Sequence, residues 1–316
     1  MSQTVRIATV TLNPTIDQTV FIPNFRAGEV NRVVQTQFDP GGKGVNVAWF
    51  LADYGFPISV TGFLGEENVL LFERLFTQKK IDDRFVRIDG RTRANIKIVD
   101  EVNQATTDIN FPGQPPTAPD IQRLFQIVEE ITAACHWFVL AGSIPAGCPP
   151  DIYGELVKLI KSRGRAVALD TSGDALQLAL PAGPNLVKPN IDELQELEGR
   201  SLQTEAEVIR AAQNWLTQGM ETVVVSMGAA GALFVEANEV VLAQPPKVTV
   251  KSTVGAGDAM VSGTVAGKTK GASLAECARL ATAFSLSAIS RVGAGLPPLD
   301  VIEEFMSQVV VVQKHN

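Results

Sequence analysis

The sequence has few of the residues that several classes of protein site require. It contains two histidines and three cysteines in 316 residues, and the cysteines are too widely spaced to form a metal-binding pair. Ser-His-Asp catalysis and histidine-rich metal sites are therefore poorly supported. Acidic residues outnumber basic ones by 34 to 27, so we expect no broad basic face for nucleic acid. Any anionic ligand must bind at a local cluster of cations.

Long apolar runs are also missing. No uninterrupted stretch is long enough to cross a membrane, and the first residues lead into strand-like sequence without a signal-peptide pattern. We therefore expect no membrane contact, a cytoplasmic location and reduced, mostly buried cysteines. With 45% hydrophobic and 19% charged residues, the chain has the composition of a globular protein with a substantial core. A single domain over residues 1–316 is the simplest organisation.

Helix-like and strand-like segments alternate along most of the chain, which predicts a mostly parallel sheet covered by helices on both faces. The expected strands are 5–12, 58–63, 136–141, 165–169, 185–187, 221–225 and 232–235. The expected helices are 66–78, 119–133, 150–161, 173–180, 258–267, 273–290 and about 299–309. Residues 18–38 and 89–111 have strand character outside this alternation, the second as a hairpin. They predict a small separate sheet that could cover a site as a lid.

A glycine-rich loop ends in Asp258 where an apolar helix begins. Backbone N–H groups are unpaired at a helix start, and glycines let a phosphate approach the main chain closely. A carboxylate beside such a site could accept the proton of an alcohol while the loop holds a transferring phosphoryl group. An aspartate that merely caps a helix behind a glycine turn explains the short motif equally well.

A second glycine cluster, residues 41–46, carries Lys43 and Asn46 at another helix start. It lacks the spacing of a Walker A loop, but Lys43 could face a phosphate and Asn46 could bond sugar hydroxyls. A solvated lysine in a plain turn is the alternative, and it is less favoured because two such loops occur. Asp17 follows the first strand, where it could bind hydroxyls or simply form an Asx turn.

Three further features have both a functional and a structural interpretation. Asn190 and Glu193 share a helix face and could orient water around Mg²⁺, although a helix cap with a capping-box acid is the simpler explanation. Arg91 and Arg93 could bind phosphate or only increase solubility. The glycine turn at 226–231 could hold nucleotide phosphates or serve as a tight connection.

Taken together, these loops resemble the PfkB family of ribokinase-like carbohydrate kinases. The motifs occur in the family's order over almost the whole chain: 13–17, 41–46, 142–143, 187–190 with Glu193, 226–231 and 253–258. The resemblance implies a three-layer α/β/α domain with a mostly parallel central sheet. It also implies a small β-sheet lid, formed by about 14–38 and 88–112, that often mediates homodimers.

The resemblance further implies a role for each motif. Asp258 would be the base, with the loop of Gly255, Ala256 and Gly257 holding the γ-phosphate of ATP. The sugar would be bound by Asp17, Gly41, Gly42, Asn46 and Ser143, with Lys43 and Arg93 on its existing phosphate. The ATP site would include Lys188, Ser226, Gly228, Gly231, Ser252, Thr253 and Gly257. Magnesium would lie near Asn190 and Glu193.

Segments 28–32, 62–65 and 90–97 are most similar to the branch of the family that converts fructose 1-phosphate to fructose 1,6-bisphosphate with Mg-ATP. Fructofuranose is nearly symmetric when its two arms are exchanged, so a tagatose-6-phosphate or fructose-6-phosphate kinase remains an alternative. A sugar-phosphate sensor without turnover is an alternative of another class, and the intact Asp258 loop argues against it. The expected partners are a small sugar phosphate and ATP, with a possible homodimer through the lid.

Overall fold

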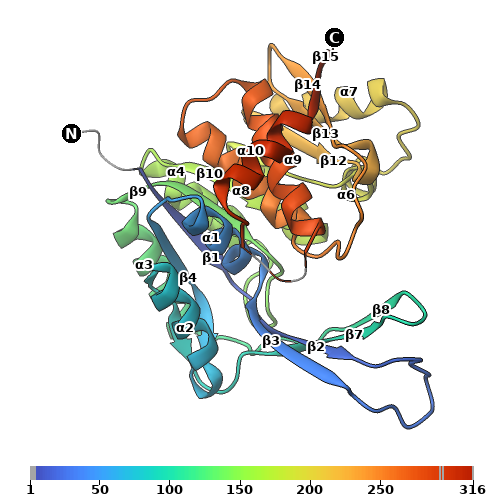
Figure 1. The fold of residues 1–316 in the computed structure, drawn as a ribbon. Helices are drawn as coiled ribbons and strands as arrows, with labels where there is room; N and C mark the ends of the chain where they lie inside the picture. The colour runs from blue at the N-terminus through green and yellow to red at the C-terminus, as the bar shows by residue number, and fades with distance from the viewer. Residues whose placement is uncertain (1–4, 292, 294, 315–316) are drawn as a thin grey trace.

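The computed structural model describes residues 5–291, 293 and 295–314. Within them, a large sheet is covered by helices on both faces, and a small second sheet projects away from it (Figure 1). Among the described residues, no helix combines the length and apolar character that a membrane crossing needs. The fold class predicted from the sequence is therefore confirmed.

The large sheet is parallel through most of its width and antiparallel at one edge. From that edge its strands are β15 (Val310–Lys314), β14 (Val240–Gln244), β13 (Ala232–Val235), β12 (Thr222–Ser226), β11 (Leu186–Val187), β10 (Ala166–Asp170), β9 (Cys135–Ala141), β1 (Arg6–Thr11), β4 (Ile58–Gly65) and β5 (Asp82–Asp83). A further short strand, β6 (Val86–Ile88), also pairs with β4. Strands β12 to β5 are parallel, so the loops that follow them meet at one end of the sheet.

Helices from distant parts of the chain cover each face. One face packs against α1 (Lys43–Asp53), α2 (Leu70–Lys79), α8 (Ala256–Thr269), α9 (Leu274–Ile289) and α10 (Leu299–Gln308). The opposite face packs against α3 (Ala118–Ile131), α4 (Ile152–Ser162), α5 (Gly173–Ala179), α6 (Ile191–Glu198) and α7 (Glu205–Leu216). Three single-turn 3₁₀ helices complete the elements: η1 (Glu66–Asn68), η2 (Leu180–Ala182) and η3 (Gly228–Ala230).

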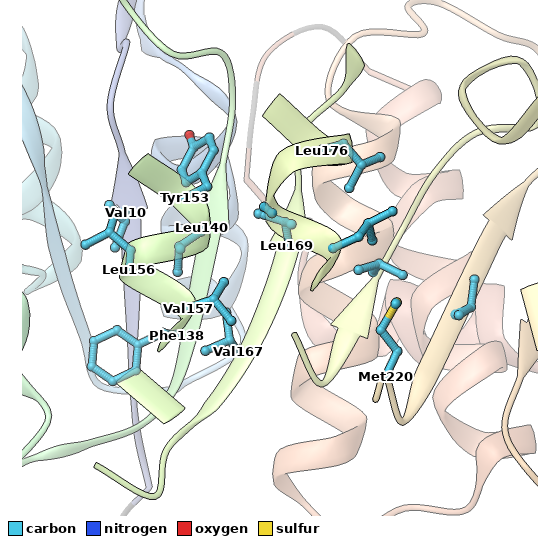
Figure 2. Packing of buried hydrophobic residues seen from close by; sticks show 14 of the residues in the cluster. Val10, Phe138, Leu140, Tyr153, Leu156, Val157, Val167, Leu169, Leu176 and Met220 are labelled. Atoms are coloured by element: carbon cyan, nitrogen blue, oxygen red, sulfur yellow. The ribbon is translucent and has the colours of Figure 1, made fainter. Parts of the chain in front are cut away.

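The strands are apolar on both faces because both faces are covered. In β9, Phe138 and Leu140 belong to one buried cluster, whereas Val139 and Ala141 belong to the other. Figure 2 shows Leu140 beside side chains of α4 such as Leu156. Each such buried side chain stabilises the fold by roughly 1.5–3 kcal/mol, so the central strands hold the loops at their ends firmly in place.

Helix α8 is held unusually close to its neighbour α9. A Cβ added at Gly263 would lie 2.5 Å from the Cα of Ala281, and one added at Gly267 would lie 2.7 Å from the sulfur of Cys277. Only glycine allows this approach, so the two helices pack backbone to backbone. The position of the first turn of α8, which carries Asp258, is thereby fixed.

The small sheet has the strand order β3 (Gln35–Gly41), β2 (Thr15–Phe21), β7 (Ala94–Asp100) and β8 (Ala105–Ile109). It extends to the lower right in Figure 1, beyond the large sheet. The predicted small sheet and its hairpin are confirmed. Asp17 lies opposite Asp39 on β3 and Asn95 on β7, so the three share one face. The other face carries an apolar cluster around Val20, Ile22 and Ile98.

Candidate active site

A cavity of about 600 Å³ lies between the small sheet and the loops that follow the parallel strands. It brings together residues from both ends of the chain. The predicted site residues that line it are Asp17, Gly42, Lys43, Asn46, Arg93, Ser143, Lys188, Asn190, Glu193, Ser226, Gly255, Gly257 and Asp258. The other predicted site residues do not line it: Gly41, Gly228, Gly231, Ser252, Thr253 and Ala256.

Asp258 lies in the first turn of α8, nearly buried. Asn46 Nδ2 donates a hydrogen bond of 2.8 Å to its Oδ2. The helix begins after Gly255, whose φ of +80° favours glycine, and no side chain caps the first turn. The cavity therefore contains a carboxylate beside a helix N-terminus whose N–H groups suit an anion.

The surroundings of Asp258 favour its neutral form more than water does. Burial is the main cause and the negative charge of Asp170 the second, and together they raise the pKa of Asp258 to about 6. Lys43, the hydrogen bond from Asn46 and Lys188 act in the opposite direction. A carboxylate with a pKa near 6 is ionised at neutral pH and still basic enough to accept a proton in a transition state.

Asp170, which was not included among the predicted site residues, contacts two lysines that line the cavity. Its Oδ1 lies 3.3 Å from Lys43 Nζ and 3.5 Å from Lys188 Nζ, and its side chain is fully buried. Burial opposes ionisation, but the two lysines prevail and hold the pKa of Asp170 below its ordinary value. Asp170 in turn raises the pKa of Lys43, so this lysine is held as a cation.

The cavity wall formed by the small sheet carries Asp17. Burial raises the pKa of Asp17 to about 6, against the effect of the nearby Lys97. A Cβ at Gly41 would lie 2.3 Å from Asp17 Oδ2, so Gly41 serves the site by leaving room for that carboxylate. Gly42 has a φ of +108°, and a Cβ there would lie 2.9 Å from the Cα of Pro14. Both positions require glycine for local steric reasons.

Arg93 lines the cavity and also contacts the backbone, and its binding of a phosphate stays a prediction. Its Nε, Nη1 and Nη2 donate to the carbonyl oxygens of Pro14, Phe111 and Asn13, at 3.3, 3.0 and 3.0 Å. Arg93 therefore joins the loop after β1 to the end of the small sheet. Arg91 does not line the cavity.

Asn190 and Glu193 form a capping box at the start of α6. Asn190 Oδ1 accepts from the N–H of Glu193, and Glu193 Oε2 accepts from the N–H of Asn190, both at 2.8 Å. The simpler of the two sequence interpretations therefore describes their contacts. Among the described residues, no group of three or more histidine, cysteine or acidic side chains could hold a metal ion. Asn190 and Glu193 nevertheless both line the cavity.

The glycine turn after β12 has structural requirements of its own. Gly231 has a φ of +99°, and a Cβ there would lie 2.0 Å from the carbonyl oxygen of Ala243 on β14. Gly228 has a φ of +58° at the start of η3. Near α8, Ser252 Oγ accepts a hydrogen bond from the N–H of Val254. Binding of ATP at these positions stays a prediction.

Residues 10–301 match the model of the pfkB family carbohydrate kinases. The chain belongs to the PfkB carbohydrate kinase family. Among curated PfkB relatives, a 1-phosphofructokinase of Rhodobacter capsulatus is 48% identical over 98% of each chain. A 1-phosphofructokinase of Escherichia coli K12 is 38% identical over 96% of this chain and 97% of its own.

Solved structures agree with this placement in the PfkB family. Phosphofructokinase-2 of E. coli in complex with substrates and products superposes with a TM-score of 0.91 at 31% identity, covering 96% of this chain and 99% of its own. Its tetrameric inhibited form gives 0.88 at 30% identity, covering 96% and 98%. The predicted family and kinase class are confirmed, and the relatives' name, 1-phosphofructokinase, agrees with the predicted function.

Several cavity residues were absent from the sequence-based site. Asn13, Thr15, Asn95, Lys97, Asp108 and Asn110 come from the small sheet or its edges. Gly142, Thr171, Ser172 and Val254 come from loops at strand ends or next to α8. The strand alternation of residues 94–99 and 105–111 was the available signal, since every second residue of a ribbon shares one face.

Proposed function

We propose that the protein is a 1-phosphofructokinase, which transfers the γ-phosphoryl group of ATP to the free primary hydroxyl of fructose 1-phosphate. The products are fructose 1,6-bisphosphate and ADP. The observation that carries the proposal is Asp258, a buried carboxylate with a raised pKa, held by Asn46 beside an uncapped helix start. The full-length similarity to 1-phosphofructokinases selects the substrate.

In this proposal Asp258 accepts the proton of the sugar hydroxyl as its oxygen attacks the γ-phosphorus. The O–P bond to the sugar forms while the bond to the β-phosphate oxygen breaks, and the proton stays on Asp258 until solvent takes it. Asn46 keeps the carboxylate oriented for this transfer. The first N–H groups of α8 stabilise the charge on the transferring group, because phosphoryl transfer depends on positioning and electrostatics.

Two lysines next to Asp258 support the same step, and we call this part of the cavity its catalytic end. Lys43 and Lys188 would neutralise phosphate charge. Their shared contact with Asp170 holds both side chains in position without a bound substrate. Positioning them before substrate binds avoids the cost of ordering two flexible side chains later. The loops 226–231 and 252–257 would hold the rest of ATP.

The residues available for magnesium fit a water-mediated site. Glu193 uses one carboxylate oxygen in its capping box, so its second oxygen can accept from a metal-bound water, and Asn190 contributes an amide oxygen nearby. Magnesium keeps several of its waters and prefers oxygen ligands. When bound, the ion would neutralise charge on the phosphates of ATP.

The small sheet would act as a lid and as a contact between two copies of the chain. Asp17 on its inner face would accept hydrogen bonds from sugar hydroxyls, next to Ser143, whose Oγ accepts from Asn13 at 3.0 Å. Exclusion of water by such a lid protects ATP from hydrolysis. A cytoplasmic location, where ATP is available, is part of the same proposal.

Steady-state kinetics test the proposal directly. We would compare kcat/KM with Mg-ATP for fructose 1-phosphate, fructose 6-phosphate and tagatose 6-phosphate. Preference for fructose 1-phosphate is the expected result. Preference for a 6-phosphate would move the protein to a neighbouring branch of the family, which the similarity to phosphofructokinase-2 keeps as the second candidate. Absence of turnover with all three would favour a sensor.

A further inference from the structure

A second cavity, of about 830 Å³, lies on the opposite side of the small sheet, and we call it the rear cavity. Ile16 and Gln18 on β2 line it, whereas Asp17 between them lines the candidate active site. Successive residues of a strand point to opposite faces of a sheet, so one sheet separates the two cavities. Of their lining residues, the two cavities share only Arg93. The rear cavity is therefore distinct from the site of the proposed reaction.

The rear cavity has a cationic lining, although the chain carries a net charge of −7. Arg74 on α2, Arg91 and Arg93 line it, and none of the described residues that line it is acidic. The side chains of Arg74 and Arg91 have no hydrogen bond or ion pair within the described part of the chain. Glu73, the neighbour of Arg74, pairs with Arg87 instead, at 3.6 Å. Two arginines are therefore available to an anion.

The backbone on the C-terminal side of Arg91 is held in place. Thr92 is buried, and its N–H donates to Asn68 Oδ1 at 2.8 Å. Asn68 Nδ2 donates in return to the carbonyl oxygen of Thr92 at 2.9 Å, and Thr92 Oγ1 accepts from the N–H of Gly65. The exposed side chain of Arg91 therefore extends from an ordered loop, so a ligand would not have to order that backbone on binding.

Large apolar side chains surround the same cavity. Phe38 on β3 and Phe111 after β8 line it and are 50% and 45% exposed, and Leu70 at the start of α2 is 64% exposed. Phe38 lies directly opposite Gln18 in the sheet, so its ring is on the rear face. Exposed apolar side chains gathered at a cavity mark a binding site, and phenylalanine rings pack well against other aromatic rings.

We propose that the rear cavity binds a phosphorylated small molecule that carries an aromatic ring. Arg74 and Arg91 bind the phosphate group, because the planar guanidinium matches phosphate oxygens in pairs. The ring packs among Phe38, Leu70 and Phe111. The volume of the cavity lies in the range of known small-molecule sites. The site takes no part in phosphoryl transfer, so it does not depend on which sugar phosphate is the substrate.

Calorimetric titration of the full chain with phenyl phosphate tests the proposal, because this probe combines a ring with a phosphate dianion. Arg74→Gln and Arg91→Gln should each raise its Kd about 10- to 100-fold, as for loss of a charge-assisted hydrogen bond. Both side chains are exposed, so thermal unfolding should not change. Arg200→Gln is the matched control and should keep the wild-type Kd, since Arg200 is an exposed arginine that pairs with Glu207 on α7. Phenol, which lacks the charge, should bind at least about 10-fold more weakly.

Three outcomes would overturn the assignment. One is an unchanged Kd in both arginine variants, and Lys43→Ala then shows whether the probe binds in the candidate active site instead. Another is equal affinity for phenol and phenyl phosphate, which would reduce the rear cavity to an apolar patch. The third is binding that appears only after dilution to monomer in sedimentation experiments, which would assign the rear cavity to a contact between copies.

Discussion

The two ends of the cavity differ in how deeply their charged side chains are buried and in how closely they pair. At the catalytic end, charges are buried and paired with one another by the protein: Asp170 is fully buried, and Lys188 is 5% exposed. At the lid end, Lys97 and Asp108 lie on a ribbon that extends from the body of the molecule and form only a long ion pair. In the first arrangement two lysines contact one carboxylate at 3.3 and 3.5 Å, whereas the ion pair of the second spans 3.9 Å.

The difference follows from how each end is supported. Strands covered on both faces and the close packing of α8 on α9 fix the catalytic residues. The small sheet has one apolar cluster of its own, centred on Val20, Ile22 and Ile98. We therefore expect substitutions at the catalytic end to affect kcat or folding, and substitutions at the lid end to affect KM for the sugar.

Asp258→Asn should have the largest effect on turnover. It removes the base and keeps the size of the side chain, so kcat should fall by about 10²- to 10⁴-fold with little change in binding of ATP or sugar phosphate. Burial disfavours the charged form of Asp258, so the neutral variant should unfold at the same temperature as the wild type or a higher one. Single-turnover kinetics and thermal unfolding measure both. Near-normal kcat would remove Asp258 from the role of base.

Asp170→Asn should have the largest effect on folding at this end. The change removes the buried carboxylate that Lys43 and Lys188 both contact, and breaking a buried ion pair in this way costs roughly 3–5 kcal/mol. We expect a matching loss in the free energy of unfolding measured in urea, and a lower kcat in the folded fraction. Lys314→Ala, which breaks the ion pair of Lys314 with Glu205 at the edge strand β15, is the control for loss of one charge. Equal stability of the two variants would contradict the view that this pair supports the catalytic end.

Burial raises the pKa of both Asp258 and Asp17 to about 6, so variants must show which of the two groups governs the pH dependence of kcat/KM. Asp258 accepts a proton only when ionised, so kcat/KM should rise with pH through about 6 and then level off. Asn46→Ala removes a hydrogen bond that lowers this pKa, so the rise should move to higher pH. Asp17→Asn should lower kcat/KM yet keep the rise through about 6. If the rise disappears in Asp17→Asn instead, the pH dependence of kcat/KM comes from ionisation of Asp17 and therefore from sugar binding at the lid.

The same two carboxyl groups should affect stability in a defined pH range. Because their folded-state pKa values lie above the ordinary value, the folded protein holds more protons than the unfolded chain between about 4 and 6. Stability should therefore decrease as pH rises through that range, and less so in Asp258→Asn. Urea unfolding at pH 4.5 and 6.5 measures the difference, and equal pH dependence in the variant would contradict it.

The sequence predicted the catalytic end better than the lid end, for a physical reason. A glycine turn at a helix start has a distinctive local sequence, so the loops around Asp258 and Lys43 could be found without knowledge of their partners. Lys97 has no such distinctive local sequence, because it is one polar residue of an alternating ribbon. Only the structure shows that its face of the ribbon lines the cavity. Asp170 ends a buried strand, and only the structure shows that Lys43 at the start of α1 and Lys188 after β11 both reach it.

Some elements of the fold also escaped the sequence analysis. Helix α7 was missed although Thr204 and Glu207 form a capping box at its start. Strands β14 and β15 were missed because a short apolar run does not indicate its pairing partner, and these two strands pair with each other across about 70 residues. The hydrogen bonds of Arg93 to three backbone carbonyl oxygens also could not be read from the sequence, because they join segments that lie far apart along the chain.

Substitutions in the exposed loop between β2 and β3 should have the smallest effect on the stability of the isolated chain. Val30 and Val34 are 87% and 69% exposed there, so replacing both with serine should change the free energy of unfolding by no more than about 0.5 kcal/mol. If two lids pack together, the double variant should nevertheless shift the protein toward monomer in sedimentation experiments. Leu178→Ser, an exposed leucine on α5, is the control and should leave the mass unchanged.

That variant also tests how far the two ends of the cavity are independent. A lid supported by a second copy should lose sugar affinity when the copies separate, whereas the catalytic end is held by its own sheet and helices. We therefore expect the double variant to raise KM for fructose 1-phosphate on dilution while KM for ATP stays constant. A parallel rise in both constants would mean that the lid and the catalytic end respond to association as one unit.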